Sequence, residues 1–188
     1  TYSFSDANGC SGMASDDVEV FALPQNPDVT FPQEVCIDAG VTTLGPLCVP
    51  CTGAVYSGTG VTDNGNGEDF QFDPTVAGVG VTVVTVTLTN ANGCTREVPV
   101  NVTVNELPNV TFTAPADLCI NDGVQLGLGG GMPQPVLDTF SMIGSALYSG
   151  PGVTDNGNGL TYTFDPATAG VGVHTITYTF TDQDGCTN

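Results

Sequence analysis

Alternation of apolar and polar residues predicts that this chain is built from β-strands. The clearest stretch is 84–89, where Val84, Val86 and Leu88 alternate with threonines. This period of two is typical of a strand with one buried face. After an Asn-Gly turn, valine occupies every second position over 98–104. A shorter alternating stretch at 2–4 predicts another strand, with a returning strand through 18–20. No helix of ordinary length is indicated, so we expect an all-β protein.

One motif occurs twice in the chain. Residues 56–67 read YSGTGVTDNGNG, and residues 148–159 read YSGPGVTDNGNG. The correspondence continues to Cys94 and Cys186 at a constant separation of 92 positions, so neither copy has gained or lost a residue there. Self-similarity at a fixed spacing is the signature of a repeat architecture.

The repeats predict three parts. Residues 1–27 match the last hairpin of a preceding repeat plus a linker, 28–107 form a first repeat, and 108–188 form a second repeat without its last strand. Residues 1–12 resemble residues 177–188, and no counterpart of the 98–104 strand follows Cys186. We therefore expect a window cut from a longer array. Cys36 and Cys119 are only 83 positions apart, which places a nine-residue insertion between Val124 and Tyr148.

The charge of the chain excludes some classes of partner. There are 20 acidic residues against a single Lys or Arg, which is Arg96, and the formal net charge is −19. Such a surface repels phosphate backbones and anionic lipid, so we expect neither nucleic-acid binding nor membrane association. No apolar run approaches the roughly 18 residues that span a bilayer, so no membrane insertion is expected.

Seven cysteines in a chain of short strands indicate an oxidising, extracellular setting and structural disulfides. Their spacing is not that of a zinc site. An early and a late cysteine recur together in each repeat, which predicts that these two bond to each other, and two further cysteines form a close pair. Cys10 would then find its partner upstream of residue 1. The expected bonds are Cys36–Cys94, Cys119–Cys186 and Cys48–Cys51.

Two interpretations fit the acidic Asp-Asn-Gly-Asn-Gly stretches that begin at Asp63 and Asp155. Asn-Gly and Asp-Asn are the residues that tight turns require. Several oxygens on a flexible loop would also suit calcium, the one cofactor that the sequence suggests, although the spacing is not that of an EF-hand. Glu68 and Asp69 add acid to the first stretch only, so calcium should bind there more tightly than at Asp155.

No arrangement of residues indicates catalysis. His174 is the only histidine, and the first copy has Thr82 at the corresponding position. Neither a nucleophile nor an orienting carboxylate accompanies it, so we expect a solvated histidine on a strand and no enzyme. Tyr56 and Tyr148 could stack on sugar rings. The absence of tryptophan makes a carbohydrate site the weaker interpretation.

The motifs resemble the Ig-like or PKD-like tandem repeats of very large surface proteins of the Bacteroidota, which include gliding-type adhesins exported by the type IX pathway. The resemblance rests on Cys-Ile, YSGxGV, FDPxxAGxG and the closing Gly-Cys, and it covers nearly the whole chain. It implies tandem β-sandwiches at the cell surface with a structural or adhesive role.

The expected partners are therefore neighbouring repeats of the chain, other copies in a fibre, and glycans or surfaces. The alternative is a calcium- or carbohydrate-binding accessory module of a secreted enzyme. A stalk would recur many more times in the full gene, whereas an accessory module would adjoin a catalytic domain.

Overall fold

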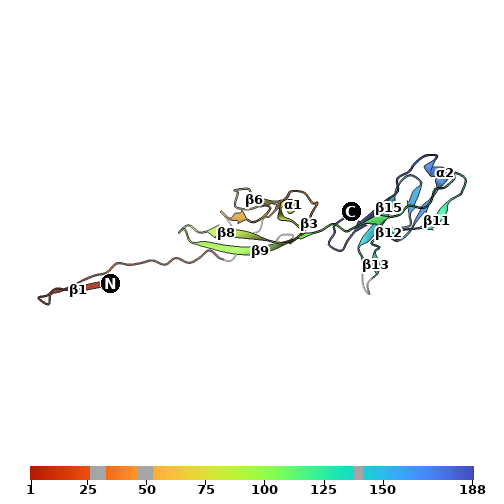
Figure 1. The fold of residues 1–188 in the computed structure, drawn as a ribbon. Coiled ribbons are helices and arrows are strands. Elements are labelled where there is room, and N and C mark those ends of the chain that lie inside the picture. The colour runs from red at the N-terminus through yellow and green to blue at the C-terminus, as the bar shows by residue number, and fades with distance from the viewer. Residues whose placement is uncertain (26–32, 46–52, 138–141) are drawn as a thin grey trace.

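The computed structural model describes residues 1–25, 33–45, 53–137 and 142–188. Regular structure in these residues is almost entirely β-strand, which confirms the expected all-β class. Buried side chains gather in two separate hydrophobic clusters, one between residues 44 and 104 and one between 148 and 180. We call residues 1–25 the leading segment, the described part of 33–107 the first segment, and the described part of 108–188 the second segment. Figure 1 shows the three in this order along the molecule.

The strands and helices follow the chain in this order. The leading segment holds β1 (Tyr2–Ser5) and β2 (Ser11–Ala14). The first segment holds β3 (Glu34–Cys36), β4 (Thr42–Leu44), β5 (Val55–Ser57), β6 (Val61–Asp63), β7 (Phe70–Phe72), α1 (Pro74–Ala77), β8 (Gly80–Thr89) and β9 (Thr95–Asn105). The second segment holds β10 (Thr111–Phe112), β11 (Gln125–Leu128), β12 (Gly131–Met132), β13 (Val136–Leu137), β14 (Met142–Ile143), β15 (Ser145–Ser149), β16 (Val153–Asp155), β17 (Tyr162–Phe164), α2 (Pro166–Ala169) and β18 (Thr177–Thr181).

Two sheets enclose the core of the first segment. The larger sheet has the order β3-β9-β8-β5, and the smaller has the order β4-β7-β6. The alternating stretches of the sequence form the long β8–β9 hairpin, in which Val84 lies opposite Val100. Phe70 and Phe72 of the smaller sheet join the valines of β8 and β9 in one cluster. The expected buried face is therefore confirmed for this hairpin.

The second segment places the same sequence positions in the same elements. Strands β16 and β17 and helix α2 each begin 92 positions after β6, β7 and α1. Its sheets, β11-β17-β16 and β15-β18, repeat the pairings of β4-β7-β6 and β5-β8. Tyr178 and Phe180 of its core stand where β8 has Val86 and Leu88, so this core is richer in aromatic rings. The two copies of the motif therefore form similar local structures.

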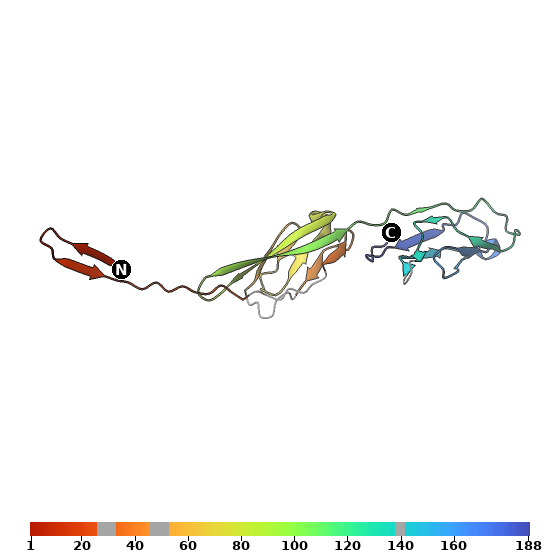
Figure 2. The same ribbon diagram turned by 90° about the horizontal axis from the view of Figure 1, so that it is seen from below.

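The leading segment differs from the sequence prediction. Strand β2 ends at Ala14, so the returning strand does not extend through Val18 and Val20. The cause is that β1 is only four residues long and is the only strand that pairs with β2 among the described residues. Beyond Ala14 the chain runs extended toward the first segment, as Figure 2 shows.

The expected insertion lies against the tyrosines of the second core. Strand β12 pairs with β10, and β13 pairs with β14 in a short hairpin. The Gly131 N–H donates to the hydroxyl of Tyr148 at 3.1 Å, and the Tyr178 hydroxyl donates to the Pro133 carbonyl at 2.5 Å. The insertion thus supplies polar partners for buried hydroxyls.

Burial of Tyr178 should make the second segment sensitive to alkali. Desolvation raises the pKa of Tyr178 to about 12, with a smaller contribution from Tyr148. An unfolded tyrosine loses its proton near pH 10, so the folded state holds its proton longer. The contribution of Tyr178 to the free energy of unfolding is therefore fully present below pH 10 and is lost as the pH rises toward 12.

Unfolding by urea at pH 8 and pH 11, followed by near-ultraviolet circular dichroism, measures this loss. The Tyr178→Phe variant should lose less stability between the two pH values than the wild type. Tyr2→Phe is the matched control, because Tyr2 is exposed. Identical pH dependence in Tyr178→Phe and wild type would contradict the assignment.

Glycine is required inside the repeated motif by a close backbone approach. Gly60 and Gly152 have φ of +77° and +73°. A Cβ at Gly60 would lie 2.5 Å from the Asp73 carbonyl oxygen, and one at Gly152 would lie 2.7 Å from that of Asp165. Both aspartates cap the short helices α1 and α2. The second glycine of YSGxG therefore packs the turn against the helix cap.

Gly60→Ala should destabilise the first segment more than Gly65→Ala does. Both positions have positive φ, but a Cβ at Gly65 meets nothing within 4 Å. We expect about 1–2 kcal/mol from the left-handed backbone at either site, and a further 1–3 kcal/mol or so from overpacking at Gly60 alone. Chemical denaturation of the two variants measures the difference. Equal losses would show that close packing is not the reason for this glycine.

Candidate functional site

The acidic turns are closed by hydrogen bonds from side chains to the backbone. Asn66 Oδ1 accepts from the N–H groups of Glu68 and Asp69 at 2.8 and 3.0 Å, and Asp63 Oδ1 accepts from the Gly65 N–H at 3.2 Å. In the second segment the same bonds are made by Asn158, to residues 160 and 161, and by Asp155, to residue 157. The repeated Asp-Asn-Gly-Asn-Gly stretch therefore has a structural function in both copies.

Asp69 and Thr161 occupy the same place in this network. Asp69 Oδ1 accepts from the side-chain amides of Asn64 and Asn66 at 2.5 and 2.9 Å, and these bonds lower the pKa of the carboxyl. Thr161 Oγ1 accepts from the corresponding amides of the second turn at 2.9 Å each. A neutral hydroxyl thus replaces a carboxylate without changing the turn, which favours the turn interpretation.

The expected calcium ligands are not grouped around one point. Glu68 is exposed, and within residues 1–25, 33–45, 53–137 and 142–188 no three His, Cys, Asp or Glu side chains lie close enough together to hold a metal ion. Asp69 bonds to side-chain amides and Asp63 to a backbone N–H group. Calcium binding at Asp63, Glu68, Asp69 and Asp155 stays a prediction.

Replacing Asp69 by threonine tests the two interpretations together. Because Thr161 makes the same bonds in the second turn, Asp69→Thr should leave the melting temperature nearly unchanged in the presence of chelator. Differential scanning calorimetry with calcium and with chelator is the measurement. A calcium-dependent rise in melting temperature that Asp69→Thr abolishes would establish a calcium site at the first turn. Equal melting temperatures with calcium and with chelator would leave the turn interpretation as the only one.

The motif tyrosines are core residues, so the sugar-stacking interpretation was wrong. Tyr56 and Tyr148 are each only 2% exposed. Their hydroxyls donate to the carbonyls of Glu68 and Leu160 at 3.0 and 3.3 Å. Neither ring face can reach a ligand, because both rings are packed in the hydrophobic clusters. Each tyrosine instead ties the acidic turn to the core.

A cleft of about 660 Å³ lies at the end of the second segment that carries α2. Its lining is mostly apolar but includes Asp117, Cys119 and His174. His174 lies before β18 and is half-buried, with Nε2 2.9 Å from the Gly170 carbonyl oxygen, so the expected solvated position on a strand was wrong. That Cys119 and His174 line the same cleft was not predicted from the sequence. No spacing in the sequence relates the two residues, which are 55 positions apart.

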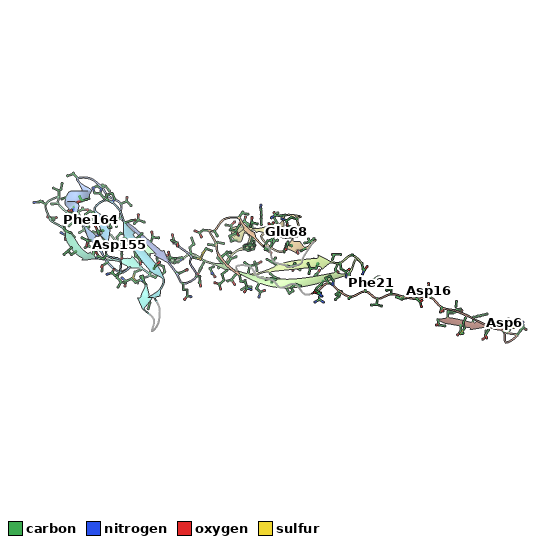
Figure 3. All side chains as sticks on the ribbon, turned by 180° about the vertical axis from the view of Figure 1, so that it is seen from behind. Asp6, Asp16, Phe21, Glu68, Asp155 and Phe164 are labelled. Atoms are coloured by element: carbon green, nitrogen blue, oxygen red, sulfur yellow. A yellow bond between two sulfur atoms is a disulfide. The ribbon has the colours of Figure 1, made fainter. Side chains whose placement is uncertain are left out.

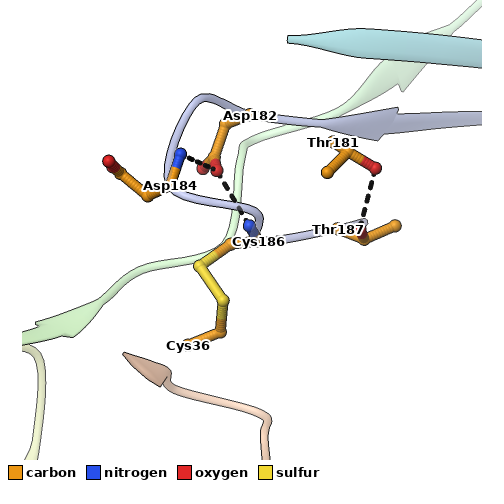
Figure 4. Close-up of a disulfide and its surroundings, with 6 residues drawn as sticks. All are labelled: Cys36, Thr181, Asp182, Asp184, Cys186 and Thr187. Atoms are coloured by element: carbon orange, nitrogen blue, oxygen red, sulfur yellow. Dashed lines mark hydrogen bonds between the residues drawn. A yellow bond between two sulfur atoms is a disulfide. The ribbon is translucent and has the colours of Figure 1, made fainter. Parts of the chain in front are cut away.

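The second notable feature is a disulfide between the two folded segments. Cys36, the last residue of β3, bonds to Cys186, which follows β18, over a sequence separation of 150. Figure 4 shows the bond and the turn that carries Cys186. Asp182 Oδ1 accepts from the N–H groups of Asp184 and Cys186 at 3.0 and 2.9 Å. The turn is thereby fixed with Cys186 directed at the first segment.

Further contacts hold the turn at this junction. The Asn188 side-chain amide donates to the Pro108 carbonyl at 3.0 Å, and Cys186 is fully buried. Asp182 and Asp184 line a cleft together with Val79, Gly80 and residues 103–109. The end of the second segment therefore lies against the linker and the far end of the first segment.

The expected pairings Cys36–Cys94 and Cys119–Cys186 were wrong. Cys36 lies opposite Asn105 at one end of β9, whereas Cys94 precedes Thr95 at the other end. The 11 residues of β9 span about 35 Å at roughly 3.4 Å per residue. A disulfide requires Cα atoms within about 7 Å, and those of Cys36 and Cys186 are 5.5 Å apart.

The remaining cysteines divide into two groups. Cys10 and Cys119 are exposed free thiols, and Cys94 is a half-buried free thiol. The expected Cys48–Cys51 bond lies outside the described residues.

A disulfide across a junction indicates an oxidising compartment. Among the described residues, the two single-turn helices are far too short to cross a bilayer.

Comparisons with known proteins give no relative. No protein-family model, no curated protein and no solved structure matches this chain.

Proposed function

We propose that this chain is a structural or adhesive segment of a long extracellular surface fibre or filament, built from tandem Ig-like β-sandwiches and without catalytic activity. The observation that carries the proposal is the Cys36–Cys186 disulfide, which joins an early strand of one folded segment to the last turn of the next. A bond in this place stabilises the joint between two segments. Stiff, covalently reinforced joints suit a spacer that projects from a surface.

The strand order of the first segment supports the Ig-like assignment. Its third, sixth and seventh strands, β5, β8 and β9, lie in one sheet, and its second, fourth and fifth, β4, β6 and β7, lie in the other. Ig-type sandwiches divide their strands in the same way. The first strand, β3, runs parallel to the last strand, β9, instead of joining the second strand.

The leading segment supports a tandem arrangement. Val18 and Val20 are 88% and 89% exposed. Their counterparts 84 positions later, Val102 and Val104, are 0% and 1% exposed in the first core. Figure 3 shows the leading segment as an extended chain, with Asp6 and Asp16 away from the folded parts and Phe21 near the end of the first segment. In a complete repeat these two valines would lie in a strand and be buried, as Val102 and Val104 are.

The arrangement of the two folded segments also supports a rod. They lie end to end in both Figure 1 and Figure 2, joined by the short stretch around Leu107 and Pro108. Proline restricts the linker. The net charge of −19 keeps neighbouring fibres apart unless specific contacts join them. Contacts of such a fibre with glycans or surfaces would be made by the exposed faces of the sandwiches, because their apolar faces are buried in the cores.

Electron microscopy of a protein with five or more successive repeats tests the proposal. Residues 97–188 can be appended several times to the full chain, because Asn188 corresponds to Arg96 in the motif. Extended rods with regularly spaced beads a few nanometres apart are expected. Compact globules or freely jointed beads would contradict the stalk and leave the accessory-module alternative, which glycan-array and calcium binding would then test.

A further inference from the structure

The three late cysteines sit in identical turns. Cys10, Cys94 and Cys186 each follow a glycine whose φ lies between +80° and +82°. In every turn an Asp or Asn four residues earlier accepts the cysteine N–H with its side-chain oxygen, at 2.9, 3.0 and 2.9 Å. The same residue donates its own N–H to the cysteine carbonyl. The three sulfur atoms are thus presented by the same local structure, although only Cys186 is bonded.

The two early cysteines also share a turn. The Cys36 carbonyl accepts from the Ala39 N–H at 3.1 Å, and the Cys119 carbonyl accepts from the Asp122 N–H at 3.0 Å. A glycine with φ of +70° or +74° follows in each case. Cys36 is bonded, whereas Cys119 is an exposed thiol.

Two residues beside the Asp182 turn have counterparts in the cleft that contains Cys119. Val79 and Gly80 line the cleft of the first segment that contains the Asp182 turn. Their counterparts 92 positions later, Val171 and Gly172, line the cleft of the second segment that contains Cys119. This second cleft is open and mostly apolar. It has the position and the cysteine to take a further late-cysteine turn.

A related contact is present before the first segment. The Asn90 side-chain amide, in the Cys94 turn, donates to the Ala22 carbonyl of the leading segment at 2.8 Å. The end of the second segment likewise contacts the linker around Leu107 and Pro108. The Cys94 turn is therefore placed against the end of whatever repeat precedes it.

From these equivalences we infer a disulfide ladder, in which each early cysteine bonds the late cysteine of the repeat that follows it. The inference rests on the proposed tandem function. Cys119 then bonds a late cysteine of a following repeat, and Cys94 and Cys10 each bond an early cysteine of a preceding repeat. The three described thiols that are free in this chain are the three whose partners lie outside residues 1–188 by this rule.

Each bond forms by oxidation of two thiols. The two sulfurs lose two protons and two electrons to an oxidised thiol–disulfide oxidoreductase, whose own disulfide is reduced to a dithiol. The Cys36–Cys186 loop covers a separation of 150 residues, which exceeds the spacing of 92 between successive repeats. Successive loops overlap, so every peptide bond of the array lies inside at least one loop. A single backbone cleavage would then leave the fibre covalently continuous.

An extended chain tests the ladder. Residues 97–188 are appended to the full 188-residue chain, and Glu106 of the added copy, an exposed residue, is changed to arginine (Glu106→Arg). Trypsin can then cut only after Arg96 and after this new arginine. The protein is oxidised, denatured and alkylated without reductant, and then digested. The ladder predicts one band on a non-reducing gel and three pieces after reduction.

The third piece, which begins at Leu107 of the added copy, gives the decision. Its late cysteine should bond Cys119 of the original chain, so Cys119→Ser should release this piece alone. Release of the third piece from the unsubstituted protein would overturn the ladder, and so would its retention in Cys119→Ser. Either result is separate from the rod or globule seen by microscopy, which judges the proposed function.

Discussion

Reduction of the Cys36–Cys186 bond should lengthen the chain under tension by about 500 Å. When the protein is pulled by its two ends, both points of attachment lie outside the loop, so the load passes through the disulfide. The residues between the two cysteines, a separation of 150, then carry no load. Released and extended at roughly 3.3–3.6 Å per residue, they give this added length.

Single-molecule pulling with and without dithiothreitol measures the change. Cys36→Ser should show the long extension even without reductant. Cys94→Ser is the matched control, because it removes a free thiol and should keep the length hidden. The same maximal extension in oxidised and reduced wild-type protein would contradict the load path.

Adding one strand after Asn188 should stabilise the second segment by roughly 3–6 kcal/mol. Strand β18 pairs only with β15 in the described part of the chain, whereas β8 lies between β5 and β9. Asn188 already exchanges backbone hydrogen bonds with Phe180 at 2.9 and 3.0 Å, in the register that Arg96 has with Leu88. Residues 97–105 appended here would continue that ladder and bury two valines at about 1.5–3 kcal/mol each.

Urea denaturation followed through the tyrosine cluster measures the gain. An appended strand with serine in place of Val102 and Val104 is the matched control, because it keeps the backbone pairing and removes the buried side chains. It should give much less stabilisation. If both extensions changed stability equally, or not at all, the added strand would not be completing this core.

Local features of the fold could be predicted from the sequence because they depend on neighbouring residues. The period of two at Val84, Val86 and Leu88 reflects one buried face, and the structure buries all three. The Asp-Asn-Gly-Asn-Gly stretches predicted turns, since these residues bond their own backbone. The close approach of Gly60 to the cap of α1 was not predicted, because it depends on which element packs against the turn.

The disulfide partner could not be predicted because it depends on which ends of strands meet. The recurrence of Cys36 with Cys94 shows only that each repeat carries both. Strand β3 runs parallel to β9, and this places Cys36 at the end of β9 that is remote from Cys94. The spacing of the cysteines in the sequence does not indicate this pairing. Burial of Tyr56 and Tyr148 was missed for a similar reason, since their polar neighbours in the motif belong to a turn that covers the rings.

Digestion at Arg96 tests most directly whether the two segments are covalently joined. Arg96 is the only Lys or Arg in the chain, and it lies between Cys94 and Cys119. The oxidised protein is denatured, alkylated and treated with trypsin without reductant. A bond from Cys36 to Cys186 predicts that residues 1–96 and 97–188 stay together on a non-reducing gel and separate only after reduction. Separation without reductant would contradict the account, because bonds confined to each segment cannot hold the two fragments together.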